Sequence, residues 1–395
     1  MHAHHGYLRS GDATLLHRFL YWRRLRMSRA RTAPLRTGQA IAAVLFTAWR
    51  SEPTSIPEAV ARHFSDIAPQ LLETGCGALA WWRLRGSGPF ADEAAASLRQ
   101  AYRLHALEAV RHEQTLQHVL SHFNEAGLFP IVFKGWTLTG FYARPCLRPY
   151  GDIDILVAPG DEAAARSVLA GLAPDLRQQI DLDMRVLGRF LPDRSFESLS
   201  ARATRKTIGE TQYTALSTED HLRLVCLHQL DHGGWRPLWL TDVAAFVEGL
   251  PSDFDWSRCL EGNAHLSDGV VALLALAEEL LGARLPRAAP RRPAPSWFRE
   301  AVLRGWAEGF HAPPASLYAL PKLGWRRGSA ALRARWPDPI SSTLHLRAPF
   351  RGIPRFVLQL AECGRRAALF LRRSWRDGVP SSQSAVAKSA QGVPP

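Results

Sequence analysis

The chain has 395 residues, of which 46% are hydrophobic, so it can bury a sizeable core and we expect two or three subdomains. Charged residues make up 22%, a globular value that excludes disorder throughout the chain. The net charge of +13 is typical of nucleic-acid binding, but nearly all the cations are arginines, spread along the chain instead of gathered in one stripe. A nucleic-acid partner is therefore not favoured.

Cysteine content and hydropathy indicate the cellular compartment of the protein. The five cysteines contain no CxxC pair, which argues against a disulfide framework or a thiolate zinc site and fits a reducing cytoplasm. The apolar stretch 40–49 follows a basic region, as a secretory signal would, but no clear small-residue cleavage site follows it, so we interpret it as a helix. No stretch reaches the length needed to span a bilayer. We expect a cytoplasmic protein with no membrane partner.

Helical patterns dominate the first third of the chain. Residues 1–36 are rich in arginine, and we expect them to be poorly ordered. The pattern over 37–127 is helical. One buried helix face has the i, i+3, i+4, i+7 spacing and consists of Leu116, Val119, Leu120 and Phe123. Gly127 then supplies a residue that tolerates a left-handed helix C-cap.

The pattern changes near residue 128, where short apolar runs alternate with helical ones. Such alternation predicts a small α/β unit over 128–215. Its elements in chain order are a strand at 129–133, a helix at 136–142, a strand at 152–157, a helix at 161–172 and a strand at 178–187.

Helices are expected again from residue 216 onward. Ser217 and Asp220 have the spacing of a capping box, which opens a helix. The last segments in chain order are a helical region at 216–283, a proline-arginine linker at 284–296, a C-terminal helical region at 297–376, and a tail at 377–395 that lacks large apolar residues and is expected to be disordered.

Asp152 and Asp154 are the first candidates for chemistry. Residues two apart in a strand point to the same face, so the two carboxylates converge, while Ile153, Ile155 and Val157 fill the opposite, buried face. Two unpaired carboxylates on a core strand repel and cost desolvation energy, which a divalent cation removes. Oxygen ligands suit Mg²⁺ or Mn²⁺. The competing interpretation is a pair of acids at a strand end that face water.

The context on both sides of this pair favours the metal site. Lys134-Gly135 follows a strand and precedes a helical pattern, a place where a glycine backbone and a helix N-terminus can bind phosphate. Asp181 and Asp183 lie on one face of the next strand and offer the third carboxylate that a two-metal phosphoryl-transfer site requires. The same residues would also fit an ordinary strand-to-helix turn with a solvated lysine, and an edge strand with exposed acids.

Together these motifs resemble the nucleotidyltransferase superfamily. Lys-Gly after a strand, then Arg-x-x-x-Asp-x-Asp-Ile-Leu-Val at 148–157, then an acidic strand, are similar to an uncharacterised bacterial nucleotidyltransferase group with a "KG…R…DIDLLV" signature. The resemblance also includes 216–228 and 238–242 and spans roughly residues 60 to 280. It implies an α+β fold, in which a small mixed β-sheet core is flanked by N- and C-terminal helical regions.

The resemblance also implies a reaction and its catalytic residues. A nucleoside monophosphate would pass from a nucleoside triphosphate to a hydroxyl of an unknown acceptor, a small molecule, peptide or protein in preference to nucleic acid. Asp152 and Asp154 would hold Mg²⁺ or Mn²⁺, and Asp181 would complete the metal site and position or deprotonate the acceptor hydroxyl. Asp183 stands where relatives often have histidine, so the roles of Asp181 and Asp183 are interchangeable at this stage.

Nucleotide binding is implied for four further residues. Lys134 and Gly135 stand where the wider superfamily has Gly-Ser, Arg148 matches the basic residue before the Asp-x-Asp pair, and His228 is a candidate for contact with the nucleotide. Because the Gly-Ser is absent, a catalytically inactive module that binds nucleotide or a partner stays open. The motifs are also compatible with a metal-dependent glycosyltransferase, in which Asp-x-Asp binds a sugar nucleotide, and with a zinc site at His228 and His232.

Overall fold

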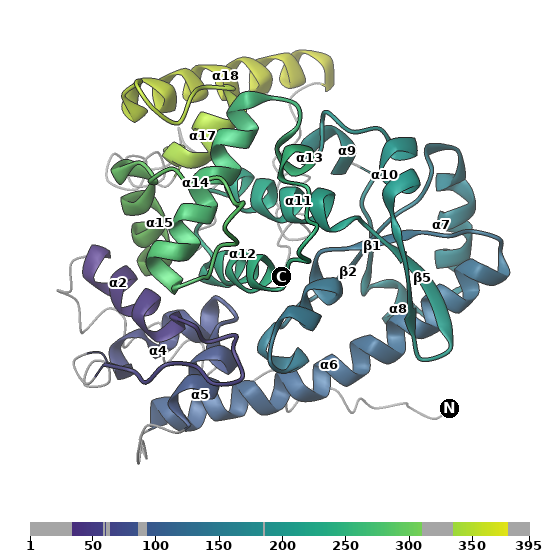
Figure 1. Ribbon diagram of the computed structural model, residues 1–395. Coiled ribbons are helices and arrows are strands. Elements are labelled where there is room, and N and C mark those ends of the chain that lie inside the picture. Colours follow the sequence, from purple (N-terminus) through teal and green to yellow (C-terminus); the bar gives the residue numbers. More distant parts are fainter. Residues whose placement is uncertain are drawn as a thin grey trace, which may run out of the picture.

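The computed structural model describes residues 34–57, 60, 64–85, 93–184, 186–309 and 335–377. The basic segment 1–36 and the tail 377–395 therefore lie outside the described residues, apart from 34–36 and 377. Figure 1 shows a sheet with its covering helices at one side of the molecule and a body of helices at the other. The α+β fold class predicted from the sequence is confirmed.

Helices precede the sheet in the chain, and the last of them leads directly into it. They are α2 (Pro34–Leu45), α4 (Phe64–Glu73), α5 (Gly77–Leu84) and the long α6 (Glu93–Glu125). The predicted face of α6, from Leu116 to Phe123, is buried against the sheet. Gly127 has the predicted left-handed backbone, with φ of 72°. This cap ends α6 a few residues before the first strand begins.

The sheet is mixed and has five strands in the order β3-β2-β1-β5-β4. Its central strand β1 pairs antiparallel with β2 and parallel with β5. The outer pairs are parallel β2–β3 and antiparallel β4–β5. The strands are β1 (Ile131–Phe133), β2 (Ile153–Leu156), β3 (Ile180–Leu182), β4 (Thr204–Ile208) and β5 (Thr211–Ala215).

The hairpin β4–β5 is missing from our prediction, which has three strands. Its sequence mixes β-branched and polar residues on both sides of Gly209-Glu210, and Gly209 has the positive φ (57°) that a tight turn requires. Most of β4 is exposed, with Arg205 and Lys206 at the edge of the sheet. The exposed strand lacks a strong apolar pattern because only one side of it packs, and charges there oppose edge-to-edge pairing.

The other predicted elements of this unit are present, with two corrections. The third strand ends at Leu182, not at 187, because β2, its pairing partner, ends at Leu156; a helical turn α9 (Val186–Arg189) follows. The helix expected at 136–142 is a 3-10 helix, η1 (Gly135–Phe141). The elements between the strands are η2 (Pro145–Leu147), η3 (Pro159–Asp161), α7 (Glu162–Gly171), α8 (Pro174–Arg177) and α10 (Phe196–Arg202).

Both faces of the sheet are covered, and this decides where the site lies. Ile153 and Ile155 pack with α6 and α7 on one face, as the alternation predicts. Phe133 and Leu156 pack on the opposite face with residues of α9, α10 and α11 (Thr218–Asp231). Because Asp154 alternates with Ile153 and Ile155, its carboxylate lies on this second face.

Helices after the sheet build the rest of the molecule. They are α11 (Thr218–Asp231), α12 (Pro237–Glu248), α13 (Trp256–Leu260), α14 (Ala264–Leu281), α15 (Ser296–Glu308), α17 (Pro339–His345) and α18 (Arg355–Asp377). Ser217 caps α11 by accepting a hydrogen bond from the Asp220 amide, as the capping box predicts. Between α14 and α15 the chain runs without regular structure, but Leu285 and Ala289 are buried in the helical core. No described helix combines the length and apolarity that a membrane span needs.

Candidate metal and nucleotide site

Three carboxylates converge where β2 and β3 lie side by side. Asp152 directly precedes β2, Asp154 lies within it, and Asp181 of β3 is opposite Asp154 in the parallel register. Paired residues of neighbouring strands share a face of the sheet, as do residues two apart in one strand. One carboxylate oxygen from each side chain lies within 4.8 Å of the other two. The three acids therefore form one group, which we call the carboxylate cluster.

Asp154 is the most deeply buried member of the cluster, with 5% of its surface exposed. Burial raises the pKa of Asp154 to about 7 against the opposing charge of Lys134, and the neighbouring charges of Asp152 and Asp181 add to the rise. A buried carboxylate among like charges is costly unless a cation neutralises it. An all-carboxylate donor set of this kind fits a hard divalent cation such as Mg²⁺ or Mn²⁺.

Lys134 is fixed against the cluster by both its backbone and its side chain. It follows β1 with a φ of 52°, a region that non-glycine residues occupy only when their contacts hold them there. Its Nζ donates to Asp154 Oδ1 at 2.7 Å and lies 3.5 Å from Asp183 Oδ2. Its backbone N–H donates to His221 Nε2 at 3.1 Å. The lysine thus brings one positive charge to the deepest acid.

His221 is a residue of the site that the sequence reasoning missed. It lies buried in the first turns of α11, and burial together with the charges of Lys206, Arg148 and Lys134 lowers its pKa to about 3. The ring is therefore neutral, and its Nε2 can accept the hydrogen bond from Lys134. The sequence carries one signal for it, a histidine directly after the capping box.

The structure separates the two acids of the third strand. Asp181 belongs to the carboxylate cluster, whereas Asp183 is buried and faces Lys134. The Asp183 N–H donates to the Ile155 carbonyl oxygen at 3.1 Å, which continues the contact with β2 beyond the end of β3. Of the two residues whose roles were interchangeable from sequence, Asp181 is the one near the other potential ligands.

Gly135 lies beside the segment that carries Asp152. A Cβ atom at this position would lie 3.1 Å from the Asp152 carbonyl oxygen and 3.4 Å from Tyr150 Cβ. The first of these distances is tighter than an ordinary van der Waals contact, so a larger residue would push against the segment that carries Asp152. Glycine suits this position because two backbone segments approach each other closely.

Arg148 lies in a buried ion pair. Its Nε and Nη2 donate to the two carboxylate oxygens of Asp242 on α12, at 3.0 and 2.8 Å, and the Tyr142 hydroxyl donates to the same Asp242 at 2.6 Å. Bidentate pairs of this kind have fixed geometry. The contact ties the segment that leads to Asp152 to the helical body. Asp242 and Tyr142 were both missed as members of this network.

His228 lies half-buried on α11 among aromatic rings. Its ring centroid is 5.3 Å from Phe190, 4.7 Å from His232 and 4.9 Å from Trp239. Burial and the charge of Lys134 hold the pKa of His228 well below its usual range. Within the described ranges, the cluster of Asp152, Asp154 and Asp181 is the only group of three or more potential metal ligands, so the zinc interpretation of the two histidines gains no third ligand.

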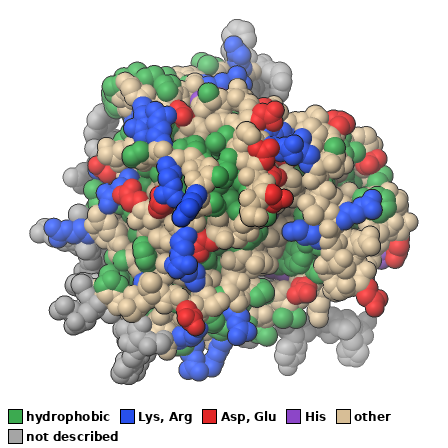
Figure 2. Space-filling model, viewed as in Figure 1, with side chains coloured by type: hydrophobic (Ala, Val, Ile, Leu, Met, Phe, Trp, Pro, Cys, Tyr) green, Lys and Arg blue, Asp and Glu red, His purple; other side chains and the backbone are tan. Residues whose placement is uncertain are grey.

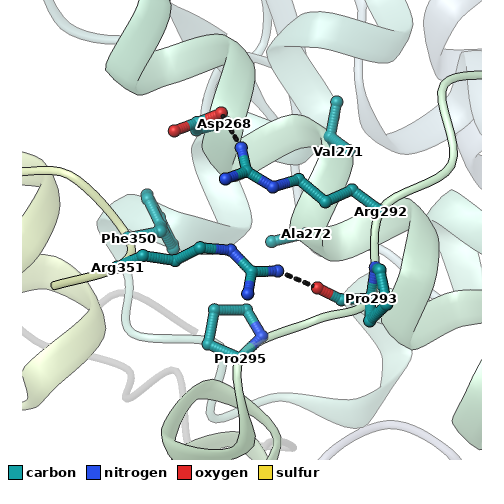
Figure 3. A pocket seen from close by; sticks show the side chains of 8 residues that line it. All are labelled: Asp268, Val271, Ala272, Arg292, Pro293, Pro295, Phe350 and Arg351. Atoms are coloured by element: carbon teal, nitrogen blue, oxygen red, sulfur yellow. Dashed lines mark hydrogen bonds and ion pairs between the residues drawn. The ribbon is translucent and has the colours of Figure 1, made fainter.

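A separate small pocket lies between the start of α14, the segment before α15 and the loop after α17. Figure 3 shows Arg292 bonded to Asp268 and Arg351 bonded to the Pro293 carbonyl oxygen. The charged groups at this pocket already bond to protein partners. It is distant in sequence from the carboxylate cluster and adds no residue to it.

The fold and the cluster together define an α+β protein that presents three acids from two neighbouring strands of a small mixed sheet. The chain belongs to the family of uncharacterised nucleotidyltransferases, whose family model matches residues 61–282. This membership assigns it to the nucleotidyltransferases and so to the transferase enzymes. No match to the chain was found among curated proteins or among solved structures.

The glycosyltransferase interpretation loses its structural basis. It requires a nucleotide-binding unit with its own strands ahead of the Asp-x-Asp pair. In the described residues before β1, every regular element is a helix. The family match and the fold both favour the nucleotidyltransferase interpretation.

Proposed function

We propose that the protein transfers a nucleoside monophosphate from a nucleoside triphosphate to a hydroxyl of an acceptor, with a divalent cation held by Asp152, Asp154 and Asp181. The convergence of these three carboxylates within 4.8 Å is the observation that carries the proposal. The acceptor oxygen attacks the α-phosphorus, the bond to the β-phosphate oxygen breaks, and pyrophosphate leaves. The acceptor class that we favour is a small molecule, peptide or protein.

The donor set supports Mg²⁺ or Mn²⁺ as the cation. A bound cation of this kind neutralises triphosphate charge and polarises the phosphorus that is attacked. Asp154 holds its place in the cluster through its strand pairing with β1 and β3. Burial is the largest cause of the raised pKa of Asp154 and disfavours its charged form, which ligation of a cation would favour.

The neighbouring side chains have distinct proposed roles. Asp181, half-buried at the cluster, accepts the proton of the attacking hydroxyl. Lys134 and Gly135 bind triphosphate oxygens, the lysine by its charge and the glycine by allowing close approach of the backbone. His228 contacts the nucleotide. For Arg148 we propose a positioning role, because its buried pair with Asp242 orders the segment that carries Asp152.

An inactive nucleotide-binding module is the second candidate. Two observations favour it: Lys134-Gly135 replaces the Gly-Ser of the wider superfamily, and Lys134 already neutralises Asp154 at 2.7 Å. In such a module the lysine would stand in for the cation. Both candidates bind nucleotide, and only the enzyme turns it over.

The experiment combines a panel of radiolabelled nucleoside triphosphates, candidate hydroxyl acceptors and Mg²⁺ or Mn²⁺, with pyrophosphate release and label transfer as readouts. We expect Asp154→Asn to reduce turnover by at least about a hundredfold. Asp161→Asn is the matched control, because it makes the same change at an exposed acid just after β2, and it should leave turnover unaltered. Nucleotide binding without turnover under every condition would support the binding module instead.

A further inference from the structure

Helix α18 lies at the margin of the molecule, with a defined inward side. Figure 1 shows it as a long rod beyond α17, its main packing partner. Leu358 and Glu362 of α18 are buried on this inward side. Glu362 accepts hydrogen bonds from Arg365 and Arg366 of the same helix and lies 3.3 Å from His345 Nδ1 of α17. These contacts hold α18 in one rotational setting.

The outward side of α18 is apolar along the helix. Phe356, Val357, Leu360 and Leu371 are 60, 53, 48 and 60% exposed. At 100° per residue they fall within one third of the helix circumference, with the small residues Gly364 and Ala367 between them and Ala368 at the edge of the same strip. We call this strip the α18 apolar stripe. A helix on the surface of a protein normally turns such a side toward its core.

The stripe continues onto the segment before α17. Trp336 stacks on Phe356 with ring centroids 5.7 Å apart, and it is itself 43% exposed. Among the residues the structure describes, eleven large hydrophobic side chains are exposed, and seven of them lie from Trp336 to Leu371. Exposed apolar surface concentrated in this way marks an interaction surface.

The charges beside the α18 apolar stripe indicate the kind of partner. Arg365 and Arg372, seven residues and two turns apart, border one edge of the stripe, and both are exposed. Glu362 is the only acidic residue among the described side chains of α18, and it is buried and paired with arginines. Figure 2 shows hydrophobic side chains, with basic ones among them, along the upper edge, where α18 lies. Such a surface is complementary to anionic headgroups above hydrocarbon.

We propose that α18 binds the surface of an anionic lipid bilayer, lying in the plane of the membrane with its apolar stripe among the acyl chains. An amphipathic helix with a long apolar strip, an aromatic side chain and arginines at its edge has the features of interfacial binding. The sequence led us to expect no membrane partner because no segment can span a bilayer, but a helix that lies in the interface needs no spanning length. The proposal is independent of the proposed activity.

The test is co-sedimentation of the full chain with vesicles of phosphatidylcholine, alone or mixed with phosphatidylglycerol. We expect binding to the mixed vesicles that weakens as salt is raised. Phe356→Ser should weaken it at least about tenfold, since an aromatic ring no longer enters the acyl region. Arg372→Gln should weaken it about fivefold, the effect of one cation near an anionic surface.

Phe129→Ser is the matched control, because Phe129 is 70% exposed but lies just before β1, far in sequence from α18. It should bind vesicles like the unmodified chain. Circular dichroism checks that each variant is folded. Equal binding by the two phenylalanine variants, or no preference for anionic vesicles, would overturn the proposal. So would a dimer that forms without lipid and is lost in Phe356→Ser, because the stripe would then cover a second copy.

Discussion

Gly135 has no side chain, which leaves room for the backbone segment that carries Asp152. We expect Gly135→Ala to slow nucleotide transfer about tenfold, because the added Cβ, 3.1 Å from the Asp152 carbonyl oxygen, displaces a member of the carboxylate cluster. The free energy of unfolding, measured in urea, should change little. Gly140→Ala tests the same substitution in the same 3-10 helix, at a position with nothing within 4 Å. Equal rates in the two variants would contradict this account.

Arg148 and Asp242 form a pair in which each side chain depends on the other. Arg148→Met leaves the Asp242 carboxylate buried without its partner, so we expect a loss of about 3–5 kcal/mol in the free energy of unfolding. Urea denaturation measures it. The double variant Arg148→Met with Asp242→Leu removes the stranded charge and should recover most of the loss. If Arg148→Met alone left the free energy of unfolding unchanged but weakened nucleotide binding, Arg148 would instead contact the nucleotide.

At the scale of elements, His345 joins three helices. Its Nε2 lies 3.0 Å from Asp231 Oδ1 on α11, and its Nδ1 lies 3.3 Å from Glu362 Oε1 on α18. The hydrogen bond and charge of Asp231, with those of Glu362, raise the pKa of His345 against the effect of burial. The charged imidazole is therefore the form that the folded protein favours.

A pH dependence of stability follows from this junction. A histidine whose pKa is raised on folding contributes its full stabilisation below the pKa of the unfolded chain and loses it as pH rises through the folded pKa. We expect His345→Asn to cost about 1–2 kcal/mol in mildly acidic solution and much less in alkaline solution. Urea unfolding of both proteins across this range measures the difference. A cost that does not change with pH would show that the ring acts only by packing.

The sheet shows which elements a linear pattern can reveal. The buried strands β1 and β2 and the helix α7 were predicted within a few residues, because their apolar residues recur at the spacing of a strand or of a helix face that packs on the core. The hairpin β4–β5 was missed, because β4 is an exposed edge whose sequence has little apolar signal. The length of β3 depends on where its partner β2 ends, which the residues of β3 do not encode.

At the scale of the whole molecule, ligand binding to the cluster should stabilise the fold. A ligand that binds only the folded state at about a hundred times its Kd adds about 2.7 kcal/mol. We expect a nucleoside triphosphate with Mn²⁺ to raise the melting temperature by a few degrees, and a chelator to reverse the rise. Asp154→Asn should abolish the effect. A rise that persists in this variant would place the nucleotide elsewhere.

The carboxylate cluster could also be predicted only in part from the sequence. Spacing within a strand predicted that Asp152 and Asp154 lie on one face of their strand and that Asp181 and Asp183 lie on one face of theirs, because side chains alternate along a strand. It could not choose between Asp181 and Asp183. That choice depends on the register of β2 against β3, which sets Asp154 opposite Asp181, and on Lys134, which approaches Asp183 from β1.

The fold class, the buried faces and the candidate acids could be predicted from the amino-acid sequence, since each of these is a local property of spacing and polarity. The partners of two buried groups could be read only from the folded chain: His221 for the Lys134 amide and Asp242 for the Arg148 side chain. These residues lie 87 and 94 positions apart in the chain. Contacts over such separations arise when whole elements pack, and no spacing within one segment records them.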